Sequence, residues 1–340
     1  MPSSDLTALL LKSDARMNRV QVLNADRAAH ALRLNRKQLG DYAVAEGMGI
    51  VKDTLGFYWL KGSTSTFVSS IVDAKNAMMN DAITDVVLAD GVYDVANATN
   101  EAATSLFFGS MYASRTKHVV LRPATPGGVT IRGVGVTCGL FIGVGAKFLT
   151  FDGLRFEGFT PVSSGVIVIS RHGRGEAGAT DIVLKNMTVG STCLGANASG
   201  TFTDHALYLS SGIGGPTRIL IEDFTVEPPA DRLRLLHSGI HVFGSPPAET
   251  NAWGVTVNRA RITAKDGLLI WGTDIHDHSY TGVVMADCST FGVRLQYANP
   301  NMSFTDCSSV RTGVQGWYSP AATPDNTAPA GTTWVRCSFT

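Results

Sequence analysis

The sequence predicts an all-β protein, a right-handed parallel β-helix in which the chain winds through stacked coils. Three observations indicate this fold. The chain has 340 residues and a hydrophobic content of 44%, which is enough to bury a large core. Charged residues make up only 16% of the chain, and its 36 glycines favour short strands and tight turns over long surface helices. From about residue 67 onward, the sequence repeats a two-part unit.

The first part of the repeated unit begins with a small residue and continues with alternating apolar and variable positions. This pattern is typical of a strand with one buried face. The starting residues are Gly165, Ala206, Gly239, Gly267, Gly292 and Gly313. Their spacing falls from 41 to 21 residues along the chain. A four-stranded propeller blade needs roughly 40 to 45 residues, so stacked coils with loop insertions in the earlier repeats fit the spacing better.

The second part of the unit is another alternating run, which ends in a polar turn. The turns carry Asp152, Asn186, Asp223, Asp287 and Asp306 at matching positions, where such side chains commonly bond to local backbone. Because neighbouring side chains of a strand point to opposite faces, alternation also separates an inward set from an outward set. We expect the inward set to form the core. Its members are Leu207, Leu209, Ile240, Val242, Leu268, Ile270, Val293 and Leu295.

Two segments precede the repeats. Residues 65–79 begin with a serine and carry apolar residues at helical spacing, which predicts a helix that closes the first coil. The apolar residues are Phe67, Ile71, Ala74 and Met78. Residues 1–66 instead carry basic residues around a sparse apolar set. We therefore expect residues 1–66 to form a helical attachment or assembly segment and residues 67–340 to form the β-helix domain.

The predicted helix is followed by the strand Asp85-Val-Val-Leu-Ala-Asp-Gly-Val-Tyr-Asp. This order of helix and strand resembles the opening of pectate-lyase-like parallel β-helix proteins. The family includes polysaccharide lyases and epimerases, glycoside hydrolases, and phage tailspike or tail-fibre proteins. The resemblance extends by architecture over residues 67–340, and it carries over no catalytic residue. It implies a protein that recognises carbohydrate.

The outward side chains of the repeated strand combine aromatic rings with hydrogen-bonding groups. Sugars offer apolar ring faces and many hydroxyls, so such a surface suits an extended polysaccharide. The alternative is a sheet face covered by an insertion or by a neighbouring subunit. The predicted substrate-binding residues are Tyr208, Phe243, Trp271, Gln296, Gln315, Trp317 and His205.

Ionisable residues lie beside this face and leave open whether the protein is an enzyme. A polysaccharide lyase needs a base and a cation, roles that Lys265, His241 and Arg294 can fill. A glycoside hydrolase needs two carboxyl groups about 5 to 9.5 Å apart, and Asp266 and Asp274 are the nearest pair in sequence. Neither set has a diagnostic spacing. Further polar residues beside the face are Asp204, His237, His276 and His278.

The sequence gives no sign of a cofactor, a metal or a charged partner surface. Asp274, His276 and His278 would share a face only locally, so we expect no metal site, and no glycine-rich segment has the context of a phosphate loop. The 28 basic residues balance the 28 acidic ones, which argues against binding to nucleic acid or to a membrane surface. The apolar run near residue 10 is too short for a signal peptide, and no stretch approaches the roughly 20 apolar residues of a transmembrane helix.

The first functional hypothesis is therefore a phage tailspike or tail-fibre protein of the virion tail that binds, and in one version depolymerises, a surface polysaccharide. We expect it to be a homo-oligomer, in particular a homotrimer, or to attach to a virion partner through residues 1–66. The alternatives are an extracellular bacterial polysaccharide lyase and a structural assembly protein without enzymatic activity.

Overall fold

The computed structural model describes residues 49–52, 58–61 and 65–339, apart from gaps at 99–101, 134, 144, 171–177, 196–203, 211–215, 245–253, 273–274, 296–300 and 319–330. Most of the predicted N-terminal segment, residues 1–48, thus lies outside the described residues. The helical prediction is wrong for residues 49–52 and 58–61 of this segment, which are strands. The strands β1 (Gly49–Lys52) and β2 (Tyr58–Lys61) form an antiparallel pair there.

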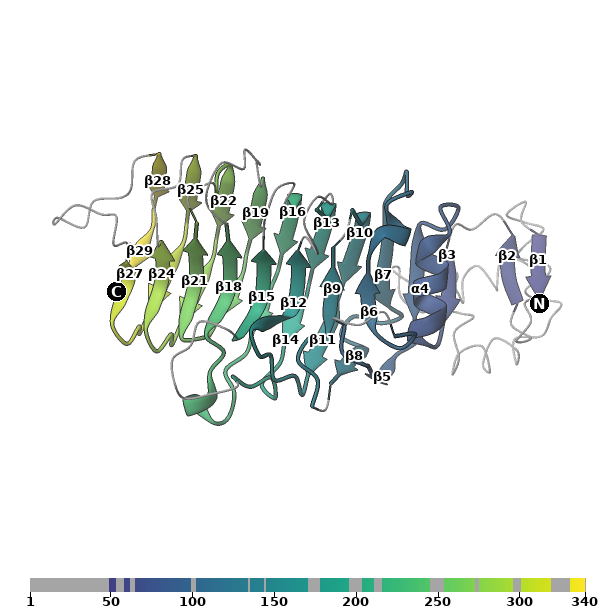
Figure 1. The fold of residues 1–340 in the computed structure, drawn as a ribbon, viewed down its shortest axis with the longest axis horizontal. Coiled ribbons are helices and arrows are strands. Elements are labelled where there is room, and N and C mark those ends of the chain that lie inside the picture. Colours follow the sequence, from purple (N-terminus) through teal and green to yellow (C-terminus); the bar gives the residue numbers. More distant parts are fainter. Residues whose placement is uncertain are drawn as a thin grey trace, which may run out of the picture.

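Three parallel sheets make up the rest of the described chain (Figure 1). A ten-stranded sheet contains β3 (Ser65–Val68), β4 (Asp85–Leu88), β7 (Val119–Pro123), β10 (Lys147–Asp152), β13 (Thr180–Lys185), β16 (Thr217–Glu222), β19 (Val255–Asn258), β22 (His278–Thr281), β25 (Met302–Thr305) and β28 (Thr332–Val335). A nine-stranded sheet contains β5 (Gly91–Asp94), β8 (Val129–Arg132), β11 (Leu154–Glu157), β14 (Thr188–Val189), β17 (Thr225–Val226), β20 (Arg261–Ile262), β23 (Val284–Ala286), β26 (Ser308–Val310) and β29 (Ser338–Phe339). An eight-stranded sheet contains β6 (Leu106–Phe108), β9 (Leu140–Ile142), β12 (Ser164–Ser170), β15 (Asp204–Ser210), β18 (Ser238–Phe243), β21 (Asp266–Trp271), β24 (Phe291–Leu295) and β27 (Gln315–Tyr318).

The chain visits the three sheets in turn, and each strand pairs with the equivalent strands of the coils before and after it. This is the right-handed parallel β-helix that the repeats predict. Among the described residues, no helix is both long and apolar enough to span a bilayer.

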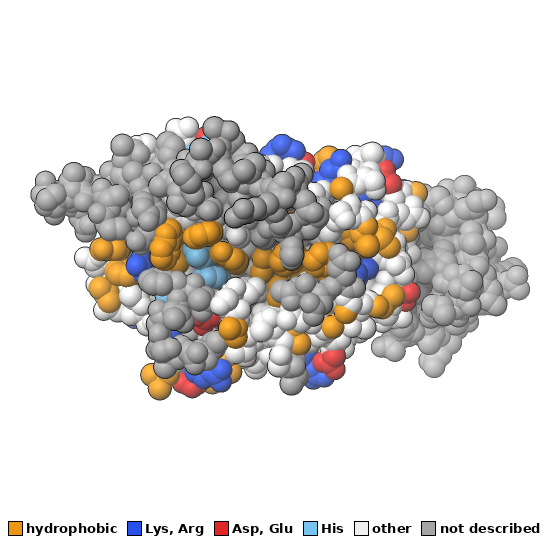
Figure 2. Space-filling model, in the orientation of Figure 1, with side chains coloured by type: hydrophobic (Ala, Val, Ile, Leu, Met, Phe, Trp, Pro, Cys, Tyr) orange, Lys and Arg blue, Asp and Glu red, His pale blue; other side chains and the backbone are white. Residues whose placement is uncertain are grey.

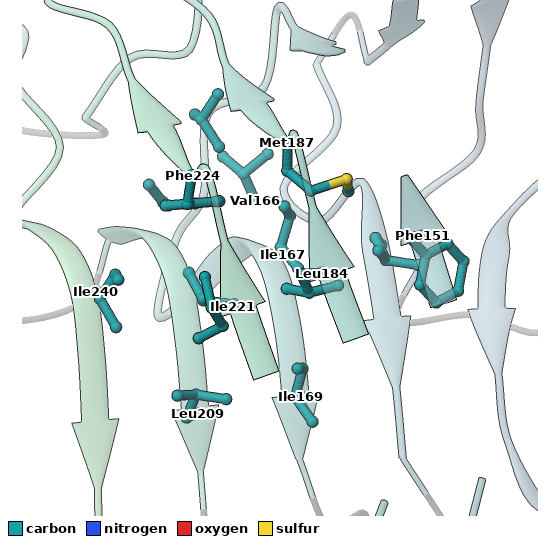
Figure 3. Packing of buried hydrophobic residues seen from close by; sticks show 14 of the residues in the cluster. Phe151, Val166, Ile167, Ile169, Leu184, Met187, Leu209, Ile221, Phe224 and Ile240 are labelled. Carbon is teal, nitrogen blue, oxygen red and sulfur yellow. The ribbon is translucent and has the colours of Figure 1, made fainter. Parts of the chain in front are cut away.

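The interior of the coils is filled by the predicted inward residues. All eight are at most 1% exposed, and the register places Leu207, Ile240, Leu268 and Val293 in one internal column. The prediction of this column is confirmed. In Figure 3, Leu209 and Ile169 of the eight-stranded sheet lie opposite Ile221 and Leu184 of the ten-stranded sheet. Cys288 and Cys307 are also buried in this core.

Two of the predicted strand starts are out of register. In β12, Ile167 pairs with Leu207, so Val166 and not Gly165 takes the position of Ala206. The predicted strand start at this coil is therefore shifted by one residue. At the last coil Val293 pairs with Trp317, so Gly316 takes the place predicted for Gly313. Trp317 therefore belongs to the inward column, where it packs against the core.

The corner between the ten-stranded and nine-stranded sheets is built from one left-handed residue per coil. Its column runs through Gly153, Asn186, Asp223, Arg259, Gly282, Asp306 and Arg336, all with positive φ. Each N–H up to Asp306 donates to a carbonyl of the next coil, which fixes the register there. The predicted local Asx bonds are replaced by ion pairs between coils. Asp223 pairs with Arg259 at 2.7 Å and Asp306 with Arg336 at 2.6 Å.

Two predicted turn positions lie outside this column. Asp152 is the last residue of β10, next to Gly153, and its carboxylate accepts a hydrogen bond from Asn186. Asp287 lies in the turn after β23, where it pairs with Arg311 at 2.6 Å. Both side chains therefore bind the following coil, as the corner residues do.

A single α-helix among the described residues, α4 (Ile71–Met79), covers the first coil (Figure 1). The predicted cap is confirmed, but the helix starts at Ser70, whose hydroxyl accepts from the N–H of Asp73, because residues 65–68 form β3. The helix buries Ile71, Ala74 and Met78. At its end, the buried Arg115 guanidinium donates to the carbonyl oxygens of Asn80 and Ile83 at 3.2 and 3.1 Å. Figure 1 shows the helix lying across the end of the stacked strands.

We expect Leu268→Ala to lower the free energy of unfolding by roughly 2 to 5 kcal/mol, because it empties part of a fully buried column. Chemical denaturation measures this change. Val314→Ala, at a side chain that is 63% exposed, serves as the control and should change stability little. Equal effects of the two substitutions would contradict the core assignment.

Candidate functional site

Strand alternation and register place eight residues in one outward column on the eight-stranded sheet. They are Phe107, Phe141, Val168, Tyr208, His241, Leu269, Arg294 and Tyr318. Figure 2 shows a band of hydrophobic side chains with histidine among them along this face of the molecule. The character of the column changes along the solenoid, from apolar at the first coils to polar and cationic at the later ones.

The first half of the outward column is a packed apolar cluster. Phe107 and Phe141 stack with ring centroids 5.4 Å apart, and Val168 and Tyr208 continue the contact. The two phenylalanines and Val168 are buried, although they point away from the coil interior. The alternative prediction of a covered sheet face therefore holds for this part of the column.

The second half of the column is mixed. His241 is only 3% exposed and Leu269 is fully buried, so the predicted continuous solvent-facing track is wrong at these two coils. Tyr208 and Arg294 are partly exposed on either side of them. Trp317, predicted to belong to the track, lies in the inward column, and Tyr318 takes the outward place beside Arg294.

A second outward column runs beside the first. It aligns Ser210 with Phe243 and Phe243 with Trp271 on successive coils. Both aromatic rings are partly exposed, and the Phe243 ring lies 6.5 Å from that of Tyr208. Tyr208, Phe243 and Trp271 therefore offer three partly exposed rings on one face.

Polar side chains at the starts of two strands contact the outward residue of the next coil. His205, the second residue of β15, places Nε2 at 2.9 Å from Nδ1 of His241. In the same way Asp266, the first residue of β21, lies 3.5 Å from Nη1 of Arg294 and 3.6 Å from Nε2 of His237. The fold thus joins these five residues, from four consecutive coils, into one polar cluster. Lys265 lies at its edge and is partly exposed.

Burial sets the protonation states of this cluster. It lowers the pKa of His241 to about 3 and that of His237 to about 4, the second helped by the positive charges of Lys265 and Arg294. Burial also raises the pKa of Asp266 to about 6, against the opposing effect of Arg294. His241 is therefore neutral at pH 7, and its hydrogen bond to His205 is of the N–H to N type, with a single shared proton.

The predicted catalytic residues differ in their access to a ligand. The side chain of Arg294 is 17% exposed, whereas that of Asp266 is 2% exposed and lies beneath it. The Nε2 atom of His241 is buried and has no hydrogen-bond partner among the described residues. Arg294 is thus the group that the cluster presents to the surface, and the buried Asp266 is its partner.

The remaining predicted site residues do not join the cluster. Gln315 pairs with Phe291 at a strand start and is exposed. Asp274 and Gln296 lie outside the described residues, so the predicted carboxyl pair has no described partner for Asp266. His278 points into the core and bonds to the hydroxyl of Tyr280 at 3.0 Å. No group of three or more potential ligands that could hold a metal ion is found in the described part of the chain.

Some members of the outward face were missed by the sequence reasoning. The strands that carry Phe107 and Phe141 are only three residues long, too short to reveal alternation. Their signal is the similarity between Leu106-Phe107-Phe108 and Leu140-Phe141-Ile142, two apolar triplets that pair in register. Tyr318 was missed because the last coil was aligned on the wrong glycine.

Comparisons with protein-family models and with curated protein sequences gave no match. Several solved structures align with most of this chain. The A-module of the mannuronan C-5 epimerase AlgE4 from Azotobacter vinelandii aligns over 73% of this chain and 76% of its own, with 13% identity and a TM-score of 0.37. The Dettilon tailspike protein aligns over 78% of this chain and 48% of its own, with 10% identity and a TM-score of 0.44. The PL6 family alginate lyase AlyGC aligns over 77% and 41%, with 12% identity and a TM-score of 0.40.

The chain is a right-handed parallel β-helix protein. It spans less than half the length of the tailspike and of the lyase. The β-helix assignment rests on the strand order of the chain itself.

The buried histidines of this β-helix should make it less stable in mild acid. A histidine whose folded-state pKa lies below its unfolded value of about 6.5 costs stability as the pH falls below that value, because only the unfolded state takes up the proton. His237, His241 and His278 act in this direction, whereas Asp266, whose pKa is raised, acts in the opposite direction between about pH 4 and 6. Because three histidines act against one carboxyl, we expect the free energy of unfolding to fall between pH 7 and pH 5.

His237→Asn should reduce this loss by about 2 kcal/mol, because asparagine takes up no proton in either state. Denaturant unfolding at pH 7 and pH 5, for the wild type and the variant, measures the difference. If both proteins lose the same free energy of unfolding between the two pH values, His237 is not held neutral in the folded state.

Proposed function

We propose that the protein binds an extended acidic polysaccharide along the outer face of the eight-stranded sheet. The observation that carries the proposal is the grouping of three partly exposed rings with one partly exposed guanidinium on four consecutive coils. The rings belong to Tyr208, Phe243 and Trp271, and the guanidinium to Arg294. Aromatic faces pack against sugar rings, and hydrogen-bonding groups between them fix the orientation of a ligand.

The length of this surface favours a polymer. Equivalent residues on neighbouring coils lie about 4.8 Å apart, so Tyr208 and Arg294 are separated by roughly 14 Å along the solenoid axis. A single sugar ring is shorter than this span. Linked rings that follow the axis would contact successive coils with successive sugars.

The charge distribution favours an acidic sugar. The Arg294 guanidinium lies toward the surface, whereas the Asp266 carboxyl that neutralises it is beneath. The raised pKa of Asp266 means that this carboxyl is partly protonated near pH 6, which leaves more of the positive charge uncompensated. Lys265 adds a second partly exposed cation at the edge of the cluster. A sugar carboxylate placed over Arg294 would make a charge-assisted hydrogen bond.

Replacing Trp271 by Ala should weaken binding of the acidic polymer by roughly 1 to 3 kcal/mol, because a large apolar contact is lost. A panel of acidic and neutral polysaccharides, tested by titration calorimetry, identifies the ligand and measures the change. The same incubations should be followed at ultraviolet wavelengths for unsaturated products and for new reducing ends, which would reveal cleavage.

Two controls make this test specific. Trp271→Phe keeps a ring at the same place and should retain part of the affinity. Val92→Ala alters an exposed residue of the nine-stranded sheet and should leave binding unchanged. The proposal fails if no acidic polymer in the panel binds, or if Trp271→Ala and Val92→Ala bind equally well.

We further propose the finer role of a tailspike-type receptor-binding protein that assembles through its N-terminal segment. The first strand of the described β-helix is β3, which begins at Ser65, so a deletion of residues 1–64 removes no strand of the three parallel sheets. Such a deletion should keep the β-sheet circular dichroism and cooperative unfolding, but lower the oligomeric mass measured by light scattering. Unchanged stoichiometry would contradict the assembly role, and loss of cooperative unfolding would show that the segment belongs to the fold.

A further inference from the structure

A groove of about 610 Å³ lies on the corner between the ten-stranded and nine-stranded sheets, over the coils of β7, β10 and β13. Each coil runs from the ten-stranded to the nine-stranded and then to the eight-stranded sheet, so this corner faces away from the eight-stranded sheet. The groove is therefore separate from the surface described above. Its volume is in the range of small-molecule sites, roughly 300 to 1,000 Å³.

One corner residue that lines the groove lacks a side chain. Gly153 stands in the left-handed corner column, with φ of +75°. The next positions of this column carry the side chains of Asn186, Asp223 and Arg259 at φ of 51 to 54°. The backbone conformation therefore does not require glycine here. A Cβ atom at position 153 would lie 3.3 Å from Cδ of Pro123, a tight contact, so a side chain here would press against the wall of the groove.

The floor and walls of the groove combine apolar surface with fixed polar groups. Pro126 is the exposed apolar residue of its lining, whereas Pro123, Ala124 and Leu154 are buried. Asn186 and Thr188 bring an amide and a hydroxyl to it. Such a surface can pack against the C–H face of a sugar ring and bond to its hydroxyls at the same time.

The charged residues of the groove are held rigidly by carboxylates. Asp85 binds the Arg122 guanidinium through two contacts of 2.8 Å. Glu227 binds that of Arg155 through contacts of 2.8 and 2.6 Å. Hydrogen bonds from Arg155 lower the pKa of Glu227, which stays ionised. The side chains are thus oriented before any ligand arrives, which reduces the entropy cost of binding.

The carboxylates that hold the two arginines disfavour an anionic ligand. The two guanidinium groups face four carboxylates, because Glu157 also pairs with Arg155 and Asp152 lines the groove itself. The surplus is negative, in contrast to the surface around Arg294. A sugar carboxylate or a phosphate would be repelled, whereas neutral hydroxyl groups can both donate to carboxylates and accept from guanidinium groups.

We propose that this groove is a second carbohydrate site, which binds one or two neutral pyranose units. The inference stands on the geometry of the corner and does not depend on the function of the opposite face. A site of this kind would hold a glycan at a distance from the eight-stranded sheet, and would select neutral sugars where the other face selects acidic ones.

The test uses the full chain and the variant Gly153→Asn, which fills the groove with a side chain that the next coil carries in the same conformation. Neutral trisaccharides built from glucose, galactose or mannose, a uronate trisaccharide and inorganic phosphate are the probes, and titration calorimetry is the measurement. At least one neutral trisaccharide should bind, and Gly153→Asn should weaken it at least about tenfold. Binding should persist in Trp271→Ala, which separates this site from the opposite face.

Gly282→Asn is the control in the same corner column, where φ is +63° and a Cβ atom would meet nothing closer than 3.8 Å, so it lacks the tight contact with Pro123 that Gly153→Asn introduces. It should leave trisaccharide binding unchanged. Thr188→Val removes one hydroxyl at constant volume and should weaken binding even if Gly153→Asn proves unstable to heat. The proposal is overturned if no neutral trisaccharide binds, if Gly153→Asn and Gly282→Asn have equal effects, or if uronate or phosphate binds in the groove as well as the neutral sugars do.

Discussion

Each coil must bring the chain back into register with the coil before it, and the rest of the molecule depends on this constraint. In-register parallel strands turn every position of the repeat into a column with a spacing of about 4.8 Å. The corner residues enforce the register, since the N–H groups of Asn186 and Asp223 donate to carbonyl oxygens of the following coil. A slip of one residue would carry Leu268 and its neighbours in the column to the outer face. Core, corner and outer face are therefore consequences of one pairing pattern.

The inner columns could be predicted from sequence because the strand period and the small starting residues coincide on four successive coils, from Ala206 to Gly292. The prediction failed where that coincidence breaks. Gly165 and Gly313 are small residues near a strand start, but pairing with a strand some 25 to 40 residues away, and not the local pattern, decides the register. Alternation also gives the direction of a side chain without saying what covers it. This is why His241 was placed on the outer face correctly and yet was expected to be exposed.

The polar cluster was beyond prediction for a related reason. His205 meets His241, and Asp266 meets Arg294, through a step of one coil and three positions along the strand. No local spacing records such a step, because the loops between coils differ in length. The cluster also carries a cost, since buried imidazoles and a buried carboxyl lose solvation that their few partners replace only in part. The hydrophobic columns beneath supply the stability that allows this loss, and the cost becomes largest in acid, where the histidines would take up protons.

A solenoid can vary its faces independently, because the columns of one face do not contact those of another. On the eight-stranded sheet the outward column changes from stacked phenylalanines to a cation within a few coils, whereas the corner column changes from glycine to asparagine to aspartate to arginine. Both series leave the backbone path unchanged. The absence of a side chain at Gly153 therefore leaves the register unchanged, and carboxylates hold the two arginines beside it, whereas Arg294 on the other face is the partly exposed member of its ion pair. A single backbone pattern can in this way present two surfaces with different chemical selectivity.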